Sequence, residues 1–560
     1  MAWPEATEKR KKINTKMLGT HSLAARPKRG LPALPELATP GSGRAAKLLL
    51  AMCPTPAYKQ RHSTRSRAAG LAIENYLLTG NAMNQPLRSN HIPLSTTTTP
   101  PRPPKPAGRT WVPLALLPLL ALPHFRPAAF AGNWPQWRGP SFNGAAEEKS
   151  LPAKFSKTEN VAWTAPMPGP SGATPVVWGD YVFISSSDDT AKTCVAMAID
   201  RKSGKELWRA KVVEGAGRDR MSTFSNSSPV TDGKHVWFFY GNGELICFEV
   251  SGNEIWRRNI EKDYGQFAFQ WTFSSTPVLL DGRLILQVLQ RNVPVQGRGR
   301  KDGESFLLAM EPLTGKELWK VPRPAEAREE SLESFTTPMP YRHGSRAELI
   351  VAGGDCLTGH DPATGKELWR WGTWNPTHIT HWRLVPSPTA GGGVALVCGP
   401  KDAPIYAVKL GLNGNLSSSD LAWQSFVQNT EEQGKTGRSL DVRELSSDVP
   451  SPLFYQGRFY VLNGNKKKLL CLEPSGKILW SGDLAGKAIF QSSPTASDGK
   501  IYAMNFAGEV FVVEAGGDSF KLLHMAEMGD SENTLRASVV PSHEQLFVRT
   551  SKTLFCIANK

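Results

Sequence analysis

The most constraining feature of this sequence is a hexapeptide, Thr-Gly-Lys-Glu-Leu-Trp, that recurs along the chain. Two identical copies occupy residues 314–319 and 364–369, and a variant that begins with serine occupies residues 203–208. Each copy lies near the end of a longer unit, which begins with Ser/Thr-Pro and continues as four short apolar runs separated by turns. Clear examples of the unit are residues 227–260 and 450–484. A unit repeated in this way predicts one structural module repeated along the chain.

The apolar runs have the properties of β-strands. They contain 4–7 residues, are rich in Val, Ile, Phe and Tyr, and are bounded by Gly, Asp and Asn. The turns carry glycine where a tight hairpin needs a positive φ. Each unit is therefore predicted to be a four-stranded antiparallel meander, which is one blade of a β-propeller.

The number of units predicts the number of blades. Unit starts lie near Thr174, Ser228, Thr276, Thr337, Ser387, Ser451, Ser493 and Ser538. The eighth unit stops after three apolar runs at Lys560, but a spare run around Trp163 precedes the first unit. We therefore predict an all-β, eight-bladed propeller over residues 161–560, with an N-terminal strand that completes the last blade. Joining strands from both ends removes exposed sheet edges. Seven blades is the alternative.

One tryptophan recurs in the fourth strand of most units, and we predict that it packs neighbouring blades together. The positions are Trp163, Trp208, Trp256, Trp319, Trp369, Trp423 and Trp480, while the seventh unit has Leu522 in this place. An indole buries roughly 150–250 Å², which gives a gross gain of about 4–6 kcal/mol as an upper bound. The role predicted for these residues is structural and not catalytic.

The positive charge of the chain is confined to its first quarter. Residues 1–131 contain 19 Lys and Arg against 4 Asp and Glu, whereas the remainder contains 47 against 46. This balance argues against a nucleic-acid partner for the folded part. Residues 1–108 form a basic low-complexity segment, which we predict to be disordered or an over-extended start of translation.

Residues 109–131 have the pattern of a secretory signal peptide. Arg109 precedes the apolar run 111–122, and Ala-Phe-Ala at 129–131 supplies small residues for cleavage. The run is shorter than the roughly 20 residues that a membrane span needs. We expect a true start further along, with Met83 as a candidate; the alternative is a basic cytoplasmic arm on an anchored protein. The mature protein would then be exported to the periplasm or envelope, with an N-terminal segment at 132–160 and no transmembrane segment.

Motifs for catalysis or metal binding are not found, so no catalytic, cofactor-binding or metal residues are predicted. The sequence has no G-x-S-x-G, H-E-x-x-H, P-loop or EF-hand pattern. His378 and His381 lie three apart among tryptophans, but a metal site needs further ligands. The six cysteines after residue 131 form no C-x-x-C pair, and four lie in apolar runs. We expect free, buried thiols.

The blade signature Asp-x-x-(Ser/Thr)-Gly-Lys-x-x-Trp, present at residues 200–208 and 361–369, resembles that of the quinoprotein-like (PQQ-repeat) propellers. The segment that precedes the first blade resembles the exported, BamB-like subgroup of planctomycete-type bacteria. The resemblance covers residues 133–560 and implies a monomeric, non-catalytic module that binds an envelope or secreted protein. The alternative that it implies is a PQQ-dependent oxidoreductase. Those enzymes need calcium, a catalytic Asp and usually a vicinal disulfide, and the site residues for PQQ and calcium are not found here.

Loop lengths indicate where a partner would bind. Within a blade the strands are named a to d, and the variable connections are mainly the d–a and b–c loops, which emerge on the same face of a propeller. Our hypothesis is that a protein partner docks there on aromatic anchors. The candidate residues are Phe267, Phe269, Trp271, Trp374, His378, His381 and Trp382. Carbohydrate binding is a third possible function, but no residue pattern in the sequence indicates it.

Overall fold

The computed structural model describes residues 132–560, except for residues 216, 218, 220, 221, 402, 426–444 and 531–534. The segments 1–108 and 109–131, with the predicted signal peptide, lie outside the described residues. Among the helices of the described part, none has the length and apolarity of a membrane span.

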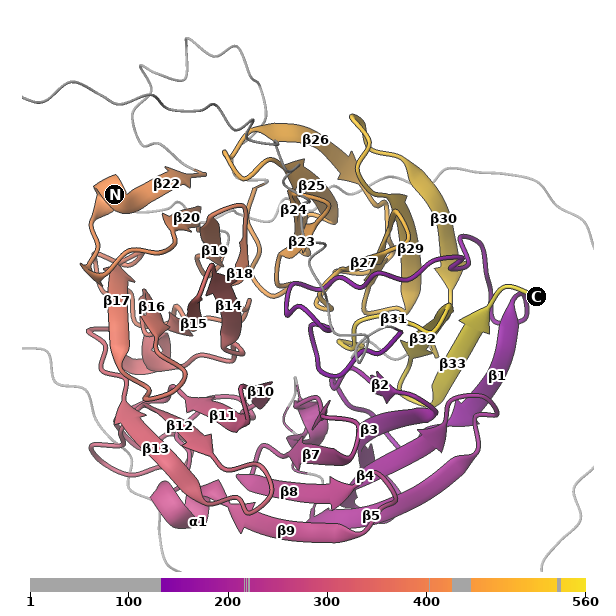
Figure 1. Ribbon diagram of the computed structural model, residues 1–560, viewed down its shortest axis with the longest axis horizontal. Helices are drawn as coiled ribbons and strands as arrows, with labels where there is room; N and C mark the ends of the chain where they lie inside the picture. The colour runs from indigo at the N-terminus through magenta and orange to yellow at the C-terminus, as the bar shows by residue number, and fades with distance from the viewer. Residues whose placement is uncertain are drawn as a thin grey trace, which may run out of the picture. The chain divides into compact units, whose positions relative to one another are not determined.

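The described residues form eight sheets, each with four antiparallel strands, that follow one another around a ring (Figure 1). This confirms the predicted eight-bladed propeller and excludes seven blades. Blades 1 to 3 contain β2 (Val176–Trp178), β3 (Tyr181–Asp188), β4 (Thr193–Asp200), β5 (Glu206–Glu214), β6 (Val230–Thr231), β7 (His235–Phe239), β8 (Glu244–Glu249), β9 (Glu254–Asn259), β10 (Val278–Leu280), β11 (Arg283–Val288), β12 (Phe306–Met310) and β13 (Glu317–Pro322). Blades 4 and 5 contain β14 (Met339–His343), β15 (Arg346–Gly353), β16 (Cys356–His360), β17 (Glu367–Gly372), β18 (Thr389–Gly391), β19 (Val394–Cys398), β20 (Ile405–Lys409), β21 (Gly414–Asn415) and β22 (Leu421–Gln424).

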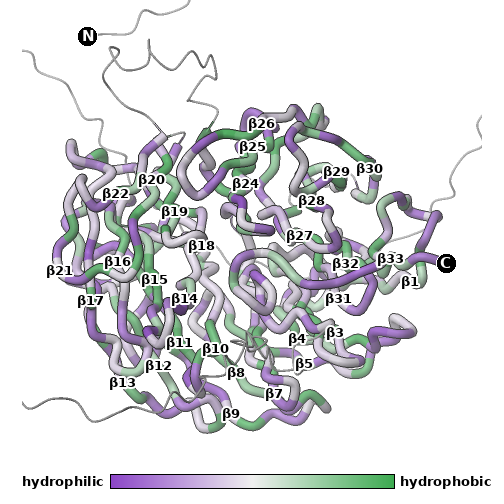
Figure 2. Tube along the Cα trace, turned by 45° about the horizontal axis from the view of Figure 1, so that its top comes forward, coloured by the Kyte–Doolittle hydropathy of each residue, from purple (hydrophilic) through white to green (hydrophobic). Residues whose placement is uncertain are grey.

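The remaining blades follow the same order and include the closing strand. They contain β23 (Leu453–Tyr455), β24 (Arg458–Asn463), β25 (Lys468–Leu472), β26 (Ile478–Asp483), β27 (Thr495–Ser497), β28 (Lys500–Met504), β29 (Glu509–Glu514), β30 (Leu522–Glu527), β31 (Val540–Ser542), β32 (Gln545–Arg549), β33 (Thr553–Ala558) and β1 (Val161–Pro166). One short helix, α1 (Ile260–Tyr264), follows β9. Hydrophobic residues follow middle strands such as β15 and β19 (Figure 2), and both strands are mostly buried.

The last blade takes strands from both ends of the described chain. β1 pairs antiparallel with β33, so that Trp163 lies opposite Cys556, and Figure 1 shows the two strands side by side. This confirms the predicted closure of the ring by an N-terminal strand.

The Leu-Trp pair of the hexapeptide forms a β-bulge. In blade 3 the c–d pairing joins Ala309 to Trp319 and Met310 to Glu317, so Leu318 is the extra residue on the outer strand. Leu207 and Ile255 take the same place before their tryptophans. The three side chains are 40–48% exposed. A bulge bends its strand and re-aims the following side chain, and here it directs the indole toward the next blade.

The glycine of the hexapeptide receives the tryptophan of the preceding blade. A Cβ atom at Gly365 would come within 2.7 Å of the Trp319 indole, and one at Gly252 within 2.7 Å of that of Trp208. The Trp208 N–H also donates to the carbonyl oxygen of Val250 (2.9 Å) in the next c–d turn. The two ends of the hexapeptide therefore belong to two different interfaces between blades.

Small residues on the third strand of a blade, the c strand, leave room for the tryptophans. Three of the six buried cysteines occupy such positions. Cys247, Cys471 and Cys556 lie opposite the tryptophans of their blades, where other blades have alanine or glycine. All six cysteines of the described chain are free and buried. These thiols behave as small apolar side chains.

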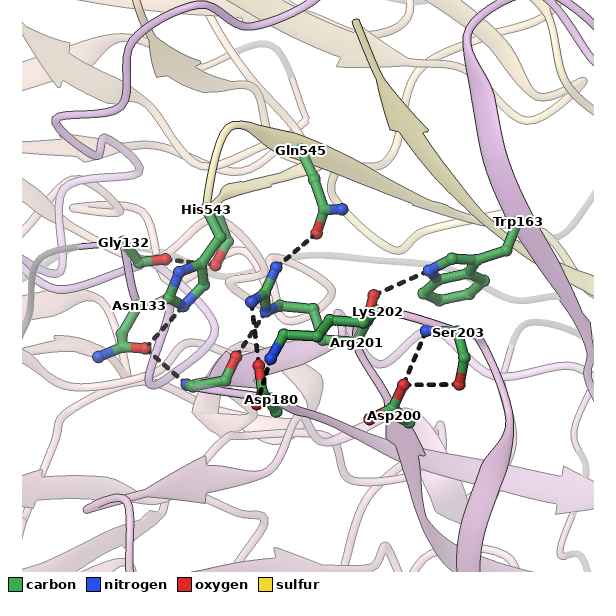
Figure 3. Close-up of polar contacts among 12 residues, drawn as sticks. Gly132, Asn133, Trp163, Asp180, Asp200, Arg201, Lys202, Ser203, His543 and Gln545 are labelled. Atoms are coloured by element: carbon green, nitrogen blue, oxygen red, sulfur yellow. Dashed lines mark hydrogen bonds and ion pairs between the residues drawn. The ribbon is translucent and has the colours of Figure 1, made fainter. Parts of the chain in front are cut away.

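The joint between blade 8 and blade 1 is held by polar contacts around Arg201 (Figure 3). The Arg201 guanidinium donates to the backbone oxygen of Gly179 (2.6 Å), to Gln545 Oε1 (3.0 Å) and to Asp180 Oδ1 (3.1 Å). The Trp163 N–H donates to the Arg201 carbonyl oxygen (2.8 Å). Contacts from both chain ends therefore meet at one residue of the first blade.

Candidate functional site

A ring of Ser and Thr residues surrounds the central channel. The Thr174 N–H donates to Ser228 Oγ (3.0 Å), the Ser228 N–H to Thr276 Oγ1 (3.2 Å), and the Thr276 N–H to Thr337 Oγ1 (3.1 Å). The remaining members are Ser387, Ser451, Ser493 and Ser538. Between Ser493 and Ser538 the bond differs, because the Ser538 hydroxyl donates to the Ser493 carbonyl (2.8 Å). The Ser/Thr-Pro starts of the repeat thus link all eight blades.

The N-terminal segment closes the channel from the side of the a–b turns. It forms bridges to the inner strands of blade 1, through Trp134 and Val177, and of blade 7, through Ala145 and Ala496. Between these bridges, Arg138 is 5% exposed and donates to the carbonyl oxygens of Pro494 (2.9 Å) and Pro452 (2.6 Å).

A small cup remains at the channel on the opposite side. Its volume is about 110 Å³, and Trp137 of the N-terminal segment lines it. Each blade contributes the residue two positions before its Ser/Thr start, namely Gly172, Asn226, Ser274, Phe335, Val385, Val449, Gln491 and Arg536. Arg536 donates to Gln491 Oε1 (2.9 Å) and lies 5.0 Å from the centre of the Phe506 ring. These eight residues all lie two positions before the Ser or Thr that begins a repeat unit. The sequence could therefore have predicted them from this spacing.

The cup does not fit PQQ with calcium. PQQ is a rigid tricarboxylate, which needs several cationic groups and, with its calcium ion, carboxylate ligands. Among the described residues that line the cup, Arg536 is the one charged side chain. Its volume also falls below the roughly 300 Å³ at which small-molecule sites usually begin.

The fourth blade departs from the repeat and carries a second cavity. Trp369 is 1% exposed, and its N–H donates to Glu348 Oε2 (2.7 Å) within its own blade. Its N–H bond therefore differs from that of Trp208, although its buried cluster also contains Ala395, Val397 and Val408 of blade 5. The fifth blade has no hexapeptide turn to receive it; instead β21 pairs in parallel with β17 as a fifth strand. We call the adjoining space of about 320 Å³ the side cavity.

The predicted aromatic anchors are divided between core and surface. Phe267, Phe269 and Trp374 are 2%, 8% and 3% exposed, so burial excludes them as surface anchors. Phe267 and Phe269 pack against Phe273, and their rings form one cluster.

The other members of that predicted set remain accessible. Trp271, Trp382 and His378 are half-buried, and His381 is exposed. His378 lines the side cavity. Among the described residues, no group of three or more His, Cys, Asp and Glu side chains is arranged to hold a metal ion.

Glu333 clamps the loops that carry the predicted anchors. It is fully buried, accepts the Gln270 N–H with both carboxylate oxygens (3.0 Å each), and pairs with Arg291. Burial raises the pKa of this carboxyl from 4.5 to about 7, against the opposing effect of Arg291. The loop is therefore fixed by a carboxylate whose charge is costly in the folded state.

This raised pKa predicts a dependence of stability on pH. The unfolded carboxyl loses its proton near pH 4.5 and the folded one near pH 7, so stability falls as pH rises through this window. The shift corresponds to a loss of up to about 3 kcal/mol. In Glu333→Gln we expect the fall to be smaller by about that amount, as measured by chemical denaturation at several pH values. Identical pH profiles for the two proteins would contradict this assignment.

Comparisons with known proteins agree with the fold. The family described as "Outer membrane protein assembly factor BamB" matches residues 153–296. A curated relative, quinohemoprotein alcohol dehydrogenase ADH IIB of Pseudomonas putida, is 24% identical over 369 residues, which are 60% of this chain and 47% of the relative. The chain thus spans about half the length of that relative.

Solved structures of two dehydrogenases share the architecture. The quinohemoprotein alcohol dehydrogenase from Comamonas testosteroni has a TM-score of 0.53 at 14% identity, covering 77% of this chain and 82% of its own. A europium-containing methanol dehydrogenase has a TM-score of 0.54 at 11% identity, covering 75% and 90%. The repeat, the ring of blades and the matches to the family model and the curated relative support the PQQ-repeat β-propeller family for this chain.

Proposed function

We propose that this chain is an exported, non-catalytic propeller that binds another protein of the cell envelope. The supporting observation is the difference between its two faces. The a–b turns are as short as Asp281–Gly282, between β10 and β11. On the opposite face, the connections 260–277, 323–338 and 373–388 and the b–c loop 289–305 extend beyond the strands. Rigid scaffolds place binding residues on such loops.

Two further features support a docking role for this d–a/b–c face. The other face has its channel closed by the N-terminal segment. On the docking face, the loop that carries Trp271 is held by Glu333, and the Phe267 N–H donates to Glu261 Oε1 (3.0 Å). Loops fixed before binding lose little conformational entropy when a partner docks. The match to the BamB family favours a protein partner, and we expect the chain to act as a monomer.

Site-specific photo-crosslinking in the native envelope tests the face. A photoreactive residue at His381, on the d–a connection of blade 4, is expected to give a discrete protein adduct. The matched control is Lys366, an exposed residue in the c–d turn of the same blade, on the opposite face. Adducts at Lys366 and none at His381 would contradict the docking face.

The alternative is a PQQ-dependent oxidoreductase, which the similarity to quinohemoprotein alcohol dehydrogenases favours. The lining of the cup supports the non-catalytic function instead, because it provides one cation and no carboxylate among the described residues. Titration of the purified protein with PQQ and calcium distinguishes the two. Stoichiometric binding of PQQ, together with reduction of an electron-accepting dye that depends on an added alcohol as electron donor, would overturn our proposal.

A further inference from the structure

The cup at the channel lies at the centre of the docking face. Its walls come from the last residues of the d–a connections, and Trp137 of the N-terminal segment adds an aromatic side chain. The volume of about 110 Å³ is small for a whole ligand, yet it is several times the roughly 30 Å³ that one water molecule occupies. This volume suits a single functional group that projects from a larger partner.

The lining of the cup has a polar half and an apolar half. Of the eight residues that lie two positions before the repeat starts, three that are consecutive in the order of the blades are apolar, namely Phe335, Val385 and Val449. The other five are also consecutive around the closed ring: Gln491, Arg536, Gly172, Asn226 and Ser274. All eight are half-buried, so a group that enters from the docking face can reach them. A group that fits both halves has a polar end and an apolar stem.

Arg536 presents two unused nitrogens to the cup. Its Nε donates to Gln491 Oε1 (2.9 Å), and the Phe506 ring centre lies 5.0 Å from the guanidinium carbon. These contacts orient the guanidinium and leave Nη1 and Nη2 without an acceptor among the described residues. Both nitrogens remain accessible to solvent. Two N–H groups in this fixed arrangement match the two oxygens of a carboxylate.

The charge of Arg536 is available to a ligand. It has no salt-bridge partner among the described residues. Burial lowers the pKa of the guanidinium from 12.5 to about 10, so it stays charged at neutral pH. Asp219 opposes this shift, but Ser222 and Thr272 donate hydrogen bonds to its carboxylate (2.6–2.8 Å), and it does not line the cup. A partly dehydrated cation is attracted to an anion more strongly than one in bulk water.

The other polar side chains of the cup also offer donors. Gln491 Oε1 is occupied by Arg536, so Gln491 Nε2 remains. Asn226 Oδ1 accepts the Gly172 N–H (2.9 Å), which leaves Asn226 Nδ2. The Trp137 indole N–H likewise has no acceptor among the described residues, and none of these three nitrogens is buried. The cup therefore favours a group that accepts hydrogen bonds and carries one negative charge.

The apolar half distinguishes between anions. Phosphate or sulfate would place charged oxygens against Phe335, Val385 and Val449, and burying charge against apolar groups is costly. An acidic side chain instead has one charge at its end and methylene groups behind it. The small volume and the position among the docking loops favour a side chain that belongs to the docked protein.

We propose that the cup receives an acidic side chain of the protein partner, glutamate or aspartate. Its carboxylate pairs with the Arg536 guanidinium, and its methylene stem packs against the apolar half. This inference rests on the docking function proposed above and names the group that the partner inserts at the centre of the docking face.

Saturation-transfer NMR of the purified protein with butyrate tests the cup without the partner. Butyrate reproduces the side chain of glutamate, and butyramide reproduces that of glutamine. We expect saturable binding of butyrate, and at least about tenfold weaker binding of butyramide or to Arg536→Gln, the usual cost of a lost charge-assisted hydrogen bond. The matched control is Arg342→Gln, which removes an exposed charge at an a–b turn on the opposite face. It should bind butyrate like the unaltered protein.

A second pair of variants keeps Arg536 and its contacts in place. Val385→Asp adds a carboxylate to the apolar half and should prevent butyrate binding, whereas Val385→Asn should retain it. Absence of saturable butyrate binding to the unaltered protein, or equal affinity for butyramide, would overturn the proposal. So would butyrate binding that is unchanged in Arg536→Gln or in Val385→Asp.

Photo-crosslinking at His381 in the native envelope connects the cup to docking. Arg536→Gln should lower the yield of the protein adduct at least about tenfold, and Arg342→Gln should not lower it. An undiminished adduct in Arg536→Gln would overturn this inference and leave the docking face standing. Absence of an adduct at His381 in the unaltered protein would overturn the docking function, and with it the partner's side chain as the ligand, even where butyrate binds.

Discussion

Replacing Trp163 by alanine is expected to lower the free energy of unfolding by about 3–5 kcal/mol, the usual cost of removing a large buried aromatic side chain. The indole is 9% exposed, packs against Gly204 and donates its N–H to the carbonyl oxygen of Arg201 (2.8 Å). The Trp163 indole joins β1 to blade 1, so its loss weakens the closure of the whole ring. Chemical denaturation of the purified protein measures the change.

A variant at a second tryptophan distinguishes the effect of lost packing from the effect of an open ring. Trp208→Ala removes an indole that contacts Gly252 in the same manner, but between two blades that are consecutive in the chain. Both variants should be destabilised, and limited proteolysis near β1 should increase only in Trp163→Ala. Equal proteolysis of β1 in the two variants, or a Trp163→Ala protein as stable as the parent, would contradict this account of the joint.

Replacing Arg138 by alanine is expected to cost about 2–5 kcal/mol, since it leaves buried carbonyl oxygens without donors. The guanidinium reaches Pro452 and Pro494 of blades 6 and 7 from the N-terminal segment. Arg138→Lys retains one donor group and should lose less. Thermal and chemical denaturation of the two variants provide the measurement. An alanine variant no less stable than the lysine variant would show that these bonds do not hold the segment in the channel.

The architecture could be predicted because the sequence repeats what every blade needs. The Ser/Thr starts, the turn glycines and the tryptophans recur at fixed spacing, so eight units and a shared last blade followed from the sequence. Some details of the same repeat were missed. Leu318 is a bulge residue exposed to solvent, and Gly365 receives the tryptophan of the preceding blade. These roles depend on contacts between units, which a single unit does not reveal.

The long loops of the d–a/b–c face were harder to predict than the cup, because their residues do not repeat. Phe269 and Trp374 lie in long loops rich in aromatic residues, and such a loop folds inward or outward according to distant partners. Phe269 is buried against Phe335 of the next connection. Trp369 has the hexapeptide sequence, but its N–H donates to Glu348 of its own blade, and the fifth blade has β21 where other blades have a hexapeptide turn. The side cavity follows from that irregularity, which only the three-dimensional arrangement brings together.

The pairing of β1 with β33 also constrains the order in which the chain folds. Blades 1 to 7 each consist of strands that are near neighbours in sequence, so they form through local contacts. Blade 8 requires Trp163 and Cys556 to meet, and closing so long a loop is entropically costly and slow. Until the last strands are available, the ring remains an open array with two free sheet edges. An intermediate of this kind is prone to associate with other chains. The risk of aggregation is therefore greatest before β1 pairs with β33.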